Sequence, residues 1–141
     1  MRPRYAALFQ RMMSTDPDER DKAFDDVLFD RQLALPDLEE GYKKYPRDPS
    51  LRFMLVQLMG FTNSNAAVPP VISALQDKDP YVRAEACRSL EDLNAVEALE
   101  SLEERLTDVE SVVRIAAAEA LAALRPRARR PTRPVKAAGE R

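Results

Sequence analysis

The residues most able to take part in chemistry are carboxylates and arginines that recur at a fixed spacing. Each arginine lies four residues after an acidic residue and directly follows an apolar one. The copies, at intervals of 31 positions, are Asp48-Pro49-Ser50-Leu51-Arg52, Asp79-Pro80-Tyr81-Val82-Arg83 and the weaker Glu110-Ser111-Val112-Val113-Arg114. A carboxylate and a guanidinium at constant spacing could form a ligand motif. A fixed period of this length also predicts a stack of similar structural units.

Other groups that serve catalysis or metal binding are scarce. The chain has no histidine, and Cys87 is its only cysteine. The commonest general base and metal ligand is therefore missing, and an intrachain disulfide is excluded. The three glycines are isolated, and the acidic residues between Asp16 and Asp30 lack the spacing of a calcium-binding loop. We therefore predict that the chain is not an enzyme and holds no metal or cofactor.

Composition favours one all-α domain. The chain has 141 residues, of which 45% are hydrophobic and 33% charged, with few glycines and aromatic residues. This balance is typical of a folded chain, and the abundant alanine, leucine, arginine and glutamate favour helix. No apolar run is long enough to cross a membrane, and the first residues lack the pattern of a secretion signal. These features predict a cytoplasmic protein.

The charge is unevenly distributed along the chain. Residues 1–124 contain 15 basic and 23 acidic residues, a net charge of −8, whereas residues 125–141 have a net charge of +6. The alternating prolines and arginines of residues 125–141 predict a disordered basic tail. Such a tail either only aids solubility or binds nucleic acid or an anionic surface. The arginines concerned are Arg125, Arg127, Arg129, Arg130 and Arg133.

The repeated phrase itself is best interpreted as a helix start. An aspartate can accept hydrogen bonds from the first free backbone N–H groups of a helix, and proline is favoured in the first helical position. The apolar residues that follow recur every four positions and predict a buried stripe on each second helix. The three stripes are Leu51, Leu55 and Met59; Val82, Ala86 and Leu90; and Val113, Ala117 and Leu121. Each unit is therefore expected to be a helix, a short turn and a second helix.

The units can be placed along residues 1–124, which we interpret as one repeat domain. A leading helix is expected over 3–13, followed by a degenerate repeat over 14–47, where Asp16-Pro17-Asp18-Glu19-Arg20 echoes the phrase. The clear repeats cover 48–78 and 79–109, and the final helix covers 110–124. First helices are expected over 66–76 and 95–106. Terminal units that depart from the pattern are typical of a solenoid.

The segment AVPPVISALQDKDPYVRAEACRSL, residues 67–90, resembles the HEAT-like repeats of phycobilisome lyases and of many small bacterial proteins. The resemblance implies an all-α fold, a right-handed α-α superhelix of about three to four helix pairs. It also implies that Arg52, Arg83 and Arg114 form a structural ladder with acidic residues at neighbouring turns, such as Asp77 and Asp108. It would further allow a lyase-like subunit that binds bilins, although no residues here mark a tetrapyrrole pocket. Repeat-level resemblance specifies a fold rather than a function.

The function that this pattern favours is a non-enzymatic protein-interaction scaffold or adaptor in the bacterial cytoplasm. The residues of the second helices that avoid the core stripe stack in rows and are expected to line the binding face. The candidates for partner binding are Met54, Tyr81, Glu85, Arg88 and Glu119. The alternative reading is that these are ordinary surface positions. The rival function is a nucleic-acid-associated protein that uses the basic tail.

The final helix is a second candidate interface. Apolar residues cover most of its circumference, whereas the last unit of a solenoid should present a polar outer face. Val112, Ile115 and Leu121 are therefore candidates for self-association or partner docking. A shallow alanine-rich surface that water tolerates would give the same pattern.

Overall fold

A computed structural model describes residues 1–129 of the chain. The polypeptide forms helices throughout this range, and no strand occurs among the described residues. The first half contains α1 (Pro3–Met12), α2 (Pro17–Phe29), α3 (Arg31–Lys44) and α4 (Pro49–Gly60). The second half contains α5 (Val68–Ala74), α6 (Pro80–Asp92), α7 (Leu99–Glu104) and α8 (Ser111–Ala128), with short 3₁₀ turns at Asn65–Ala67, Val96–Ala98 and Arg105–Thr107.

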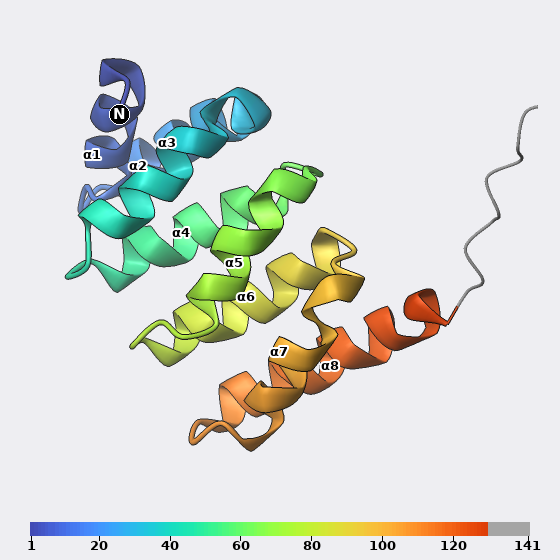
Figure 1. Cartoon of the computed structure of the whole chain (residues 1–141). Coiled ribbons are helices and arrows are strands. Elements are labelled where there is room, and N and C mark those ends of the chain that lie inside the picture. Colours follow the sequence, from blue (N-terminus) through green and yellow to red (C-terminus); the bar gives the residue numbers. More distant parts are fainter. Residues whose placement is uncertain (130–141) are drawn as a thin grey trace, which may run out of the picture.

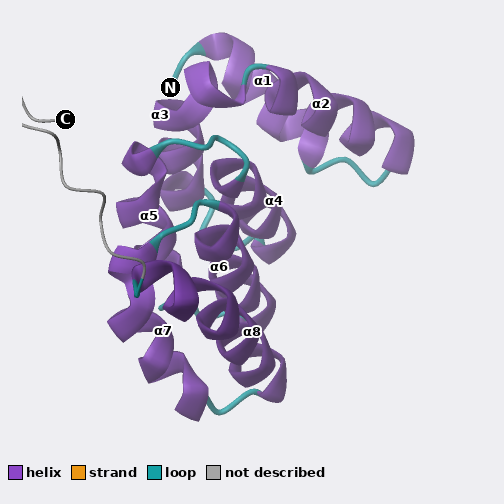
Figure 2. Ribbon diagram, turned by 90° about the vertical axis from the view of Figure 1, so that its right-hand side faces the viewer, coloured by secondary structure: helices purple, strands orange, loops and turns teal. Residues whose placement is uncertain are grey.

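The helices form two layers, which makes the fold an α-α solenoid (Figures 1 and 2). One layer contains α3, α5 and α7, and the other contains α4, α6 and α8 side by side. Each helix of the second layer packs against the helix that precedes it in the chain and against the neighbouring helix or helices of its own layer. The predicted all-α repeat architecture is therefore confirmed, with α1 and α2 as the first of four helix pairs.

The second helices begin where the repeated phrase predicts. Asp48 accepts a hydrogen bond from the backbone N–H of Leu51, and Asp79 accepts from those of Tyr81 and Val82. Proline follows each cap as the first helical residue, where its missing N–H costs nothing. Glu110 makes no such side-chain bond at the start of α8. Asn63 and Asn94 connect the helices with positive φ angles of 52° and 54°, a conformation that asparagine tolerates better than most residues.

The predicted apolar stripes form the core between the layers. All nine stripe residues of α4, α6 and α8 have at most 1% of their surface exposed. Close approach between α4 and α6 depends on Gly60, because a Cβ atom there would lie 2.6 Å from Ser89 Oγ and 2.9 Å from Ser89 Cα. The small Ala86, fully buried, lies in the same row of helices. Small residues thus set the spacing of the stack.

Three helices differ from the predicted boundaries. The helix expected over 66–76 begins as a 3₁₀ turn at Asn65–Ala67, and α5 ends at Ala74. The helix expected over 95–106 is divided into two 3₁₀ turns and the short α7. Helix α8 continues to Ala128, four residues beyond the predicted end, with Pro126 inside it. The extra turn is held by Arg125, which pairs with Glu103 at 3.4 Å, and by Arg127, which donates to Asn94 Oδ1 at 3.0 Å. The rest of the predicted tail, residues 130–141 with Arg130 and Arg133, lies outside the described residues.

The first pair of helices is turned away from the rest of the stack. Helices α4, α6 and α8 pack along most of their lengths, whereas α2 touches α4 only over a small area. Figure 2 shows α2 running out of line with the row that the later second helices form. Met54 of α4 is therefore partly exposed, whereas its equivalents Glu85 of α6 and Ala116 of α8 are buried.

Candidate binding groove and arginine ladder

Two buried ion pairs connect successive units of the solenoid. Arg52 Nε and Nη2 donate to the two carboxylate oxygens of Asp77 at 2.9 and 3.1 Å. Arg83 repeats this geometry with Asp108, at 3.0 Å for both bonds. Two parallel N–H···O bonds between a guanidinium and a carboxylate are the strong, geometrically specific form of this interaction. The ladder therefore fixes the register of one helix pair on the next.

Each ladder arginine also binds the turn that precedes its own helix. Arg52 Nη1 donates to the carbonyl of Pro46, Arg83 Nη1 to that of Asp77, and Arg114 Nη1 to that of Asp108. The carbonyl in every case belongs to the residue two positions before the helix cap. Arg114 is exposed, and it has no carboxylate partner among residues 1–129. Within this range the third arginine binds only in its own unit.

The ladder aspartates also support the local turns. Asp77 accepts from the backbone N–H of Asp79 and from Tyr42 Oη, and Asp108 accepts from the N–H of Glu110 and from Arg105 Nη1. Burial alone would raise the pKa of both carboxyls. The hydrogen bonds, chiefly from Arg52 to Asp77 and from Arg83 to Asp108, outweigh burial and hold each pKa below its ordinary value of 3.8. Both aspartates therefore stay ionised at neutral pH.

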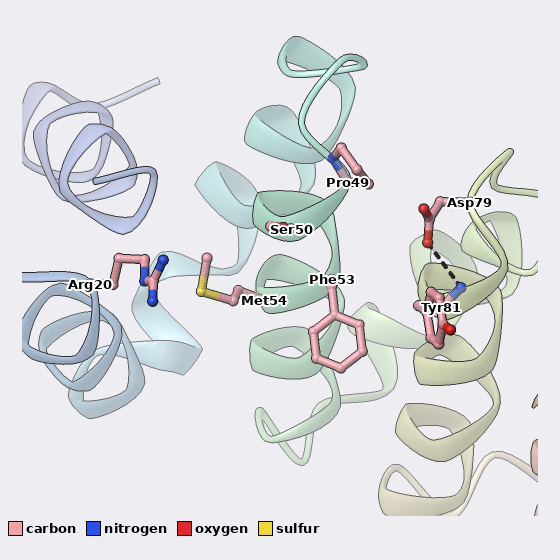
Figure 3. Close-up of a pocket in the computed structure, with 7 residues that line it drawn as sticks. All are labelled: Arg20, Pro49, Ser50, Phe53, Met54, Asp79 and Tyr81. Carbon is pink, nitrogen blue, oxygen red and sulfur yellow. Dashed lines mark hydrogen bonds between the residues drawn. The ribbon is translucent and has the colours of Figure 1, made fainter. Parts of the chain in front are cut away.

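A groove of about 460 Å³ opens at the N-terminal ends of the second helices. It is lined by Arg20 of α2, by Pro49, Ser50, Phe53 and Met54 of α4, and by Asp79 and Tyr81 at the start of α6. Figure 3 shows Arg20 and Met54 facing each other from α2 and α4, with Phe53 between Met54 and Tyr81. Tyr81 is 63% exposed, and Phe53 and Met54 are half-buried. An apolar surface bordered by polar groups is typical of a site where a partner binds.

The groove includes two of the five residues predicted to bind a partner. Met54 and Tyr81 line it, whereas Arg88 and Glu119 are exposed on α6 and α8 outside its lining. Glu85 is instead buried, with 6% of its surface exposed, and accepts a hydrogen bond from Arg88. Burial raises the pKa of Glu85, because desolvation outweighs the favourable charge of Arg88. Glu85 therefore lies in the packed stack and does not face the solvent as predicted.

Sequence reasoning missed Arg20 and Phe53 as groove residues. Phe53 belongs to a row whose other members are Ala84, which is fully buried, and Ile115, which is exposed, so the row has no uniform character. A signal for Arg20 was present, because Pro46 stands two residues before the Asp48 cap, where the later units have Asp77 and Asp108. Because this unit has proline where the later units have aspartate, an arginine on α2 lacks the acidic partner that the later arginines use.

The three candidate residues for self-association differ in exposure, since two are at least partly exposed and one is buried. Ile115 is 58% exposed and Val112 is half-buried, but Leu121 is only 1% exposed. The expectation that Leu121 takes part in association is corrected, because Leu121 continues the inward stripe of Val113 and Ala117. The outer face of α8 carries Arg114, Ala118 and Glu119 beside Ile115, so it is more polar than its composition suggests.

Other chemical sites are not formed by the described residues. No group of three or more histidine, cysteine, aspartate or glutamate side chains within residues 1–129 is arranged to hold a metal ion. Cys87 is buried, and desolvation raises the pKa of its thiol to about 12, so it stays protonated. Within the same range, none of the helices combines the length and the apolar character needed to cross a bilayer.

These features define the chain as an α-helical repeat protein whose stacked second helices present an open groove. The family profile for HEAT repeats matches residues 35–122, so the chain belongs to the HEAT repeat family. The predicted resemblance to HEAT-like repeats is thereby confirmed. No curated protein sequence matches the chain.

Two solved structures are similar to this fold. Human deoxyhypusine hydroxylase, in complex with glycerol, aligns over 94% of this chain with a TM-score of 0.68 and 22% sequence identity. The chain spans 47% of the length of that hydroxylase. The complex of CpcE and CpcF of phycocyanin lyase from Nostoc sp. PCC7120 aligns over 85% of this chain and 64% of its own, with a TM-score of 0.47 and 20% identity.

The prediction that the chain is not an enzyme was wrong as an inference from its sequence. A hydroxylase shares the fold, so enzymes are among the proteins built on it. The prediction relied on missing residue types, above all histidine, and on the repeat architecture. Neither argument excludes catalysis, because chemistry depends on particular residues of a site and not on the scaffold that carries them.

Proposed function

We propose that this HEAT repeat chain is a protein-interaction scaffold that binds a partner segment in the groove between α2, α4 and α6. The observation that carries the proposal is the presence of Phe53, Met54 and Tyr81 together in a solvent-open groove. Aromatic residues, methionine and arginine are enriched at protein interfaces, and exposed tyrosines often contribute much of the binding energy. The match to HEAT repeats supports the same reading.

The elements beneath the groove favour a preformed site. Helices α4 and α6 pack closely on each other, and the Arg52–Asp77 pair connects their units. Residues on such closely packed helices lose little backbone freedom when a partner binds, because their backbone is already ordered. The variable element is α2, which makes little contact with α4 and could adjust the width of the groove.

Photo-crosslinking in the expressing cells tests the proposal. A photoreactive phenylalanine analogue replaces Phe53 in one variant and Val109 in a control, because Val109 is 86% exposed but lies outside the groove. We expect a discrete crosslinked protein from position 53 that is absent from position 109 and is lost when Met54→Glu is added. Circular dichroism melting checks that each variant folds. Equal crosslinking from both positions would count against a groove-specific partner.

A further inference from the structure

Arg20 of α2 occupies the ladder position of its helix. It lies four residues after the Asp16 cap, as Arg52 lies four residues after Asp48 and Arg83 four residues after Asp79. In this chain, arginines at the equivalent positions of α4 and α6 bind aspartate through Nε and Nη2. An arginine in this position of the repeat therefore binds an aspartate when the next unit provides one.

The next unit does not supply that ligand to Arg20. Asp77 and Asp108 each lie two residues before the cap of a second helix, but the residue two positions before the Asp48 cap of α4 is Pro46, which has no carboxylate. The ion pairs found within residues 1–129 do not include Arg20. The ladder thus lacks an ion pair between the first two units, where α2 makes little contact with α4.

Three acidic groups that lie close to Arg20 in the sequence or in the groove lining make contacts with other groups. Asp16 accepts from the backbone N–H of Asp18, Glu19 pairs with Arg11, and Asp79 caps α6. The Arg20 side chain extends instead across the groove toward Met54 (Figure 3). A partly buried guanidinium beside an apolar surface gains most from an ionised acceptor that comes with its own apolar neighbour.

We propose that the groove binds a peptide segment of a partner protein in which a carboxylate lies next to a large apolar side chain. The carboxylate takes the place of the missing aspartate at Arg20, and the apolar side chain packs on Phe53, Met54 and Tyr81. The inference rests on the proposed function, since it names the chemistry of the segment that the groove accepts. It assigns Arg20 the role of selecting acidic over neutral segments.

Nuclear magnetic resonance titration with two matched peptides tests the inference. The probes are acetyl-Leu-Asp-Phe-amide and acetyl-Leu-Asn-Phe-amide, which differ only in the carboxylate. Chemical shifts are followed at the Met54 methyl group and the Arg20 Nε–H of the full chain. We expect both peptides to perturb the groove, with the Asp peptide binding at least about threefold more tightly, as a charge-assisted hydrogen bond requires.

Two variants separate the carboxylate contact from general charge. Arg20→Gln should abolish the preference for the Asp peptide while the Met54 methyl shift persists. Lys22→Gln removes the same charge from the opposite side of α2, where Lys22 is exposed, and should leave the preference unchanged. Equal affinity for both peptides in the unmodified chain would overturn the role of Arg20. A lack of groove shifts with either peptide would also overturn the inference, and the crosslinking experiment then decides separately whether the groove binds a protein.

Discussion

Arg83 and Asp108 lie 25 residues apart in the chain, yet they are joined by two parallel hydrogen bonds of 3.0 Å between successive units. Only 11% of the Arg83 side chain and 3% of the Asp108 side chain are exposed. A buried pair of this kind contributes specificity of register more surely than it contributes net stability. Breaking it is costly, because the remaining charge stays buried without its partner.

Arg83→Ala should therefore destabilise the solenoid by about 3 kcal/mol, the scale seen when one member of a buried pair is removed. Asp108 keeps Arg105 as a second donor, which limits the loss. Urea unfolding measures the effect. Arg114→Ala is the matched control, since the Arg114 side chain has the same place in its unit but makes only one hydrogen bond within residues 1–129, and the substitution should cost less than about 1 kcal/mol. Equal losses would show that the ladder carboxylates do not matter.

The ladder aspartates should make stability depend on pH in acid. Their pKa values are lowered in the folded chain, so their contribution is present above the ordinary value of 3.8 and is lost as pH falls through the lower folded value. The free energy of unfolding of the unmodified chain should exceed that of Asp77→Asn at pH 7, and the gap should close below pH 3.8. A gap that stays constant down to about pH 2 would contradict this origin.

Glu85 should have the opposite dependence. Burial raises its pKa, so the ionised form is disfavoured in the folded chain and weakens stability at pH values above that raised pKa. Glu85→Gln should be at least as stable as the unmodified chain at pH 7, since the amide still accepts from Arg88. The melting difference should shrink as pH falls through the raised pKa and should disappear below the ordinary value of 4.5. A large loss at pH 7 that persists in acid would instead indicate a packing role.

Ala86→Leu should overpack the stack. The alanine is fully buried between second helices, and added methylene groups in a well-packed core cost about 1–3 kcal/mol. Ala118→Leu on the exposed face of α8 provides the control, because it adds the same atoms in a helix of the same layer without a neighbour to clash with. Thermal melts of the two variants should differ by several degrees. Similar melting temperatures would mean that the stack adjusts freely.

Self-association through α8 can be tested at Ile115, because its exposure leaves the fold intact on substitution. If the outer face of α8 forms an interface, sedimentation should show a species heavier than 16.0 kDa that Ile115→Glu converts to monomer. Leu121→Glu is unsuitable for this purpose, since a buried charge in the core should unfold the chain. Identical sedimentation of the unmodified and Ile115→Glu chains would remove the hypothesis.

Local chemistry in the sequence accounts for the repeated helices. Aspartate caps, first-turn prolines and apolar residues at every fourth position determine where a second helix starts and which face it buries, so α4 and α6 begin at the residues predicted. Asn63 and Asn94 mark turns for a similar local reason. The end of α8 was harder to predict, because Arg125 and Arg127 extend it through contacts with residues of earlier elements.

The sequence by itself thus determined the repeat unit, the core stripe and the membership of a solenoid fold, because these depend on neighbours within about one helical turn. Only the tertiary structure decided which exposed positions face a common groove. Glu85 and Met54 occupy equivalent places in successive units, yet one is buried and the other lines the groove. The difference arises because α6 packs closely on α4 whereas α4 makes little contact with α2, and such packing between units cannot be read from residues within one unit.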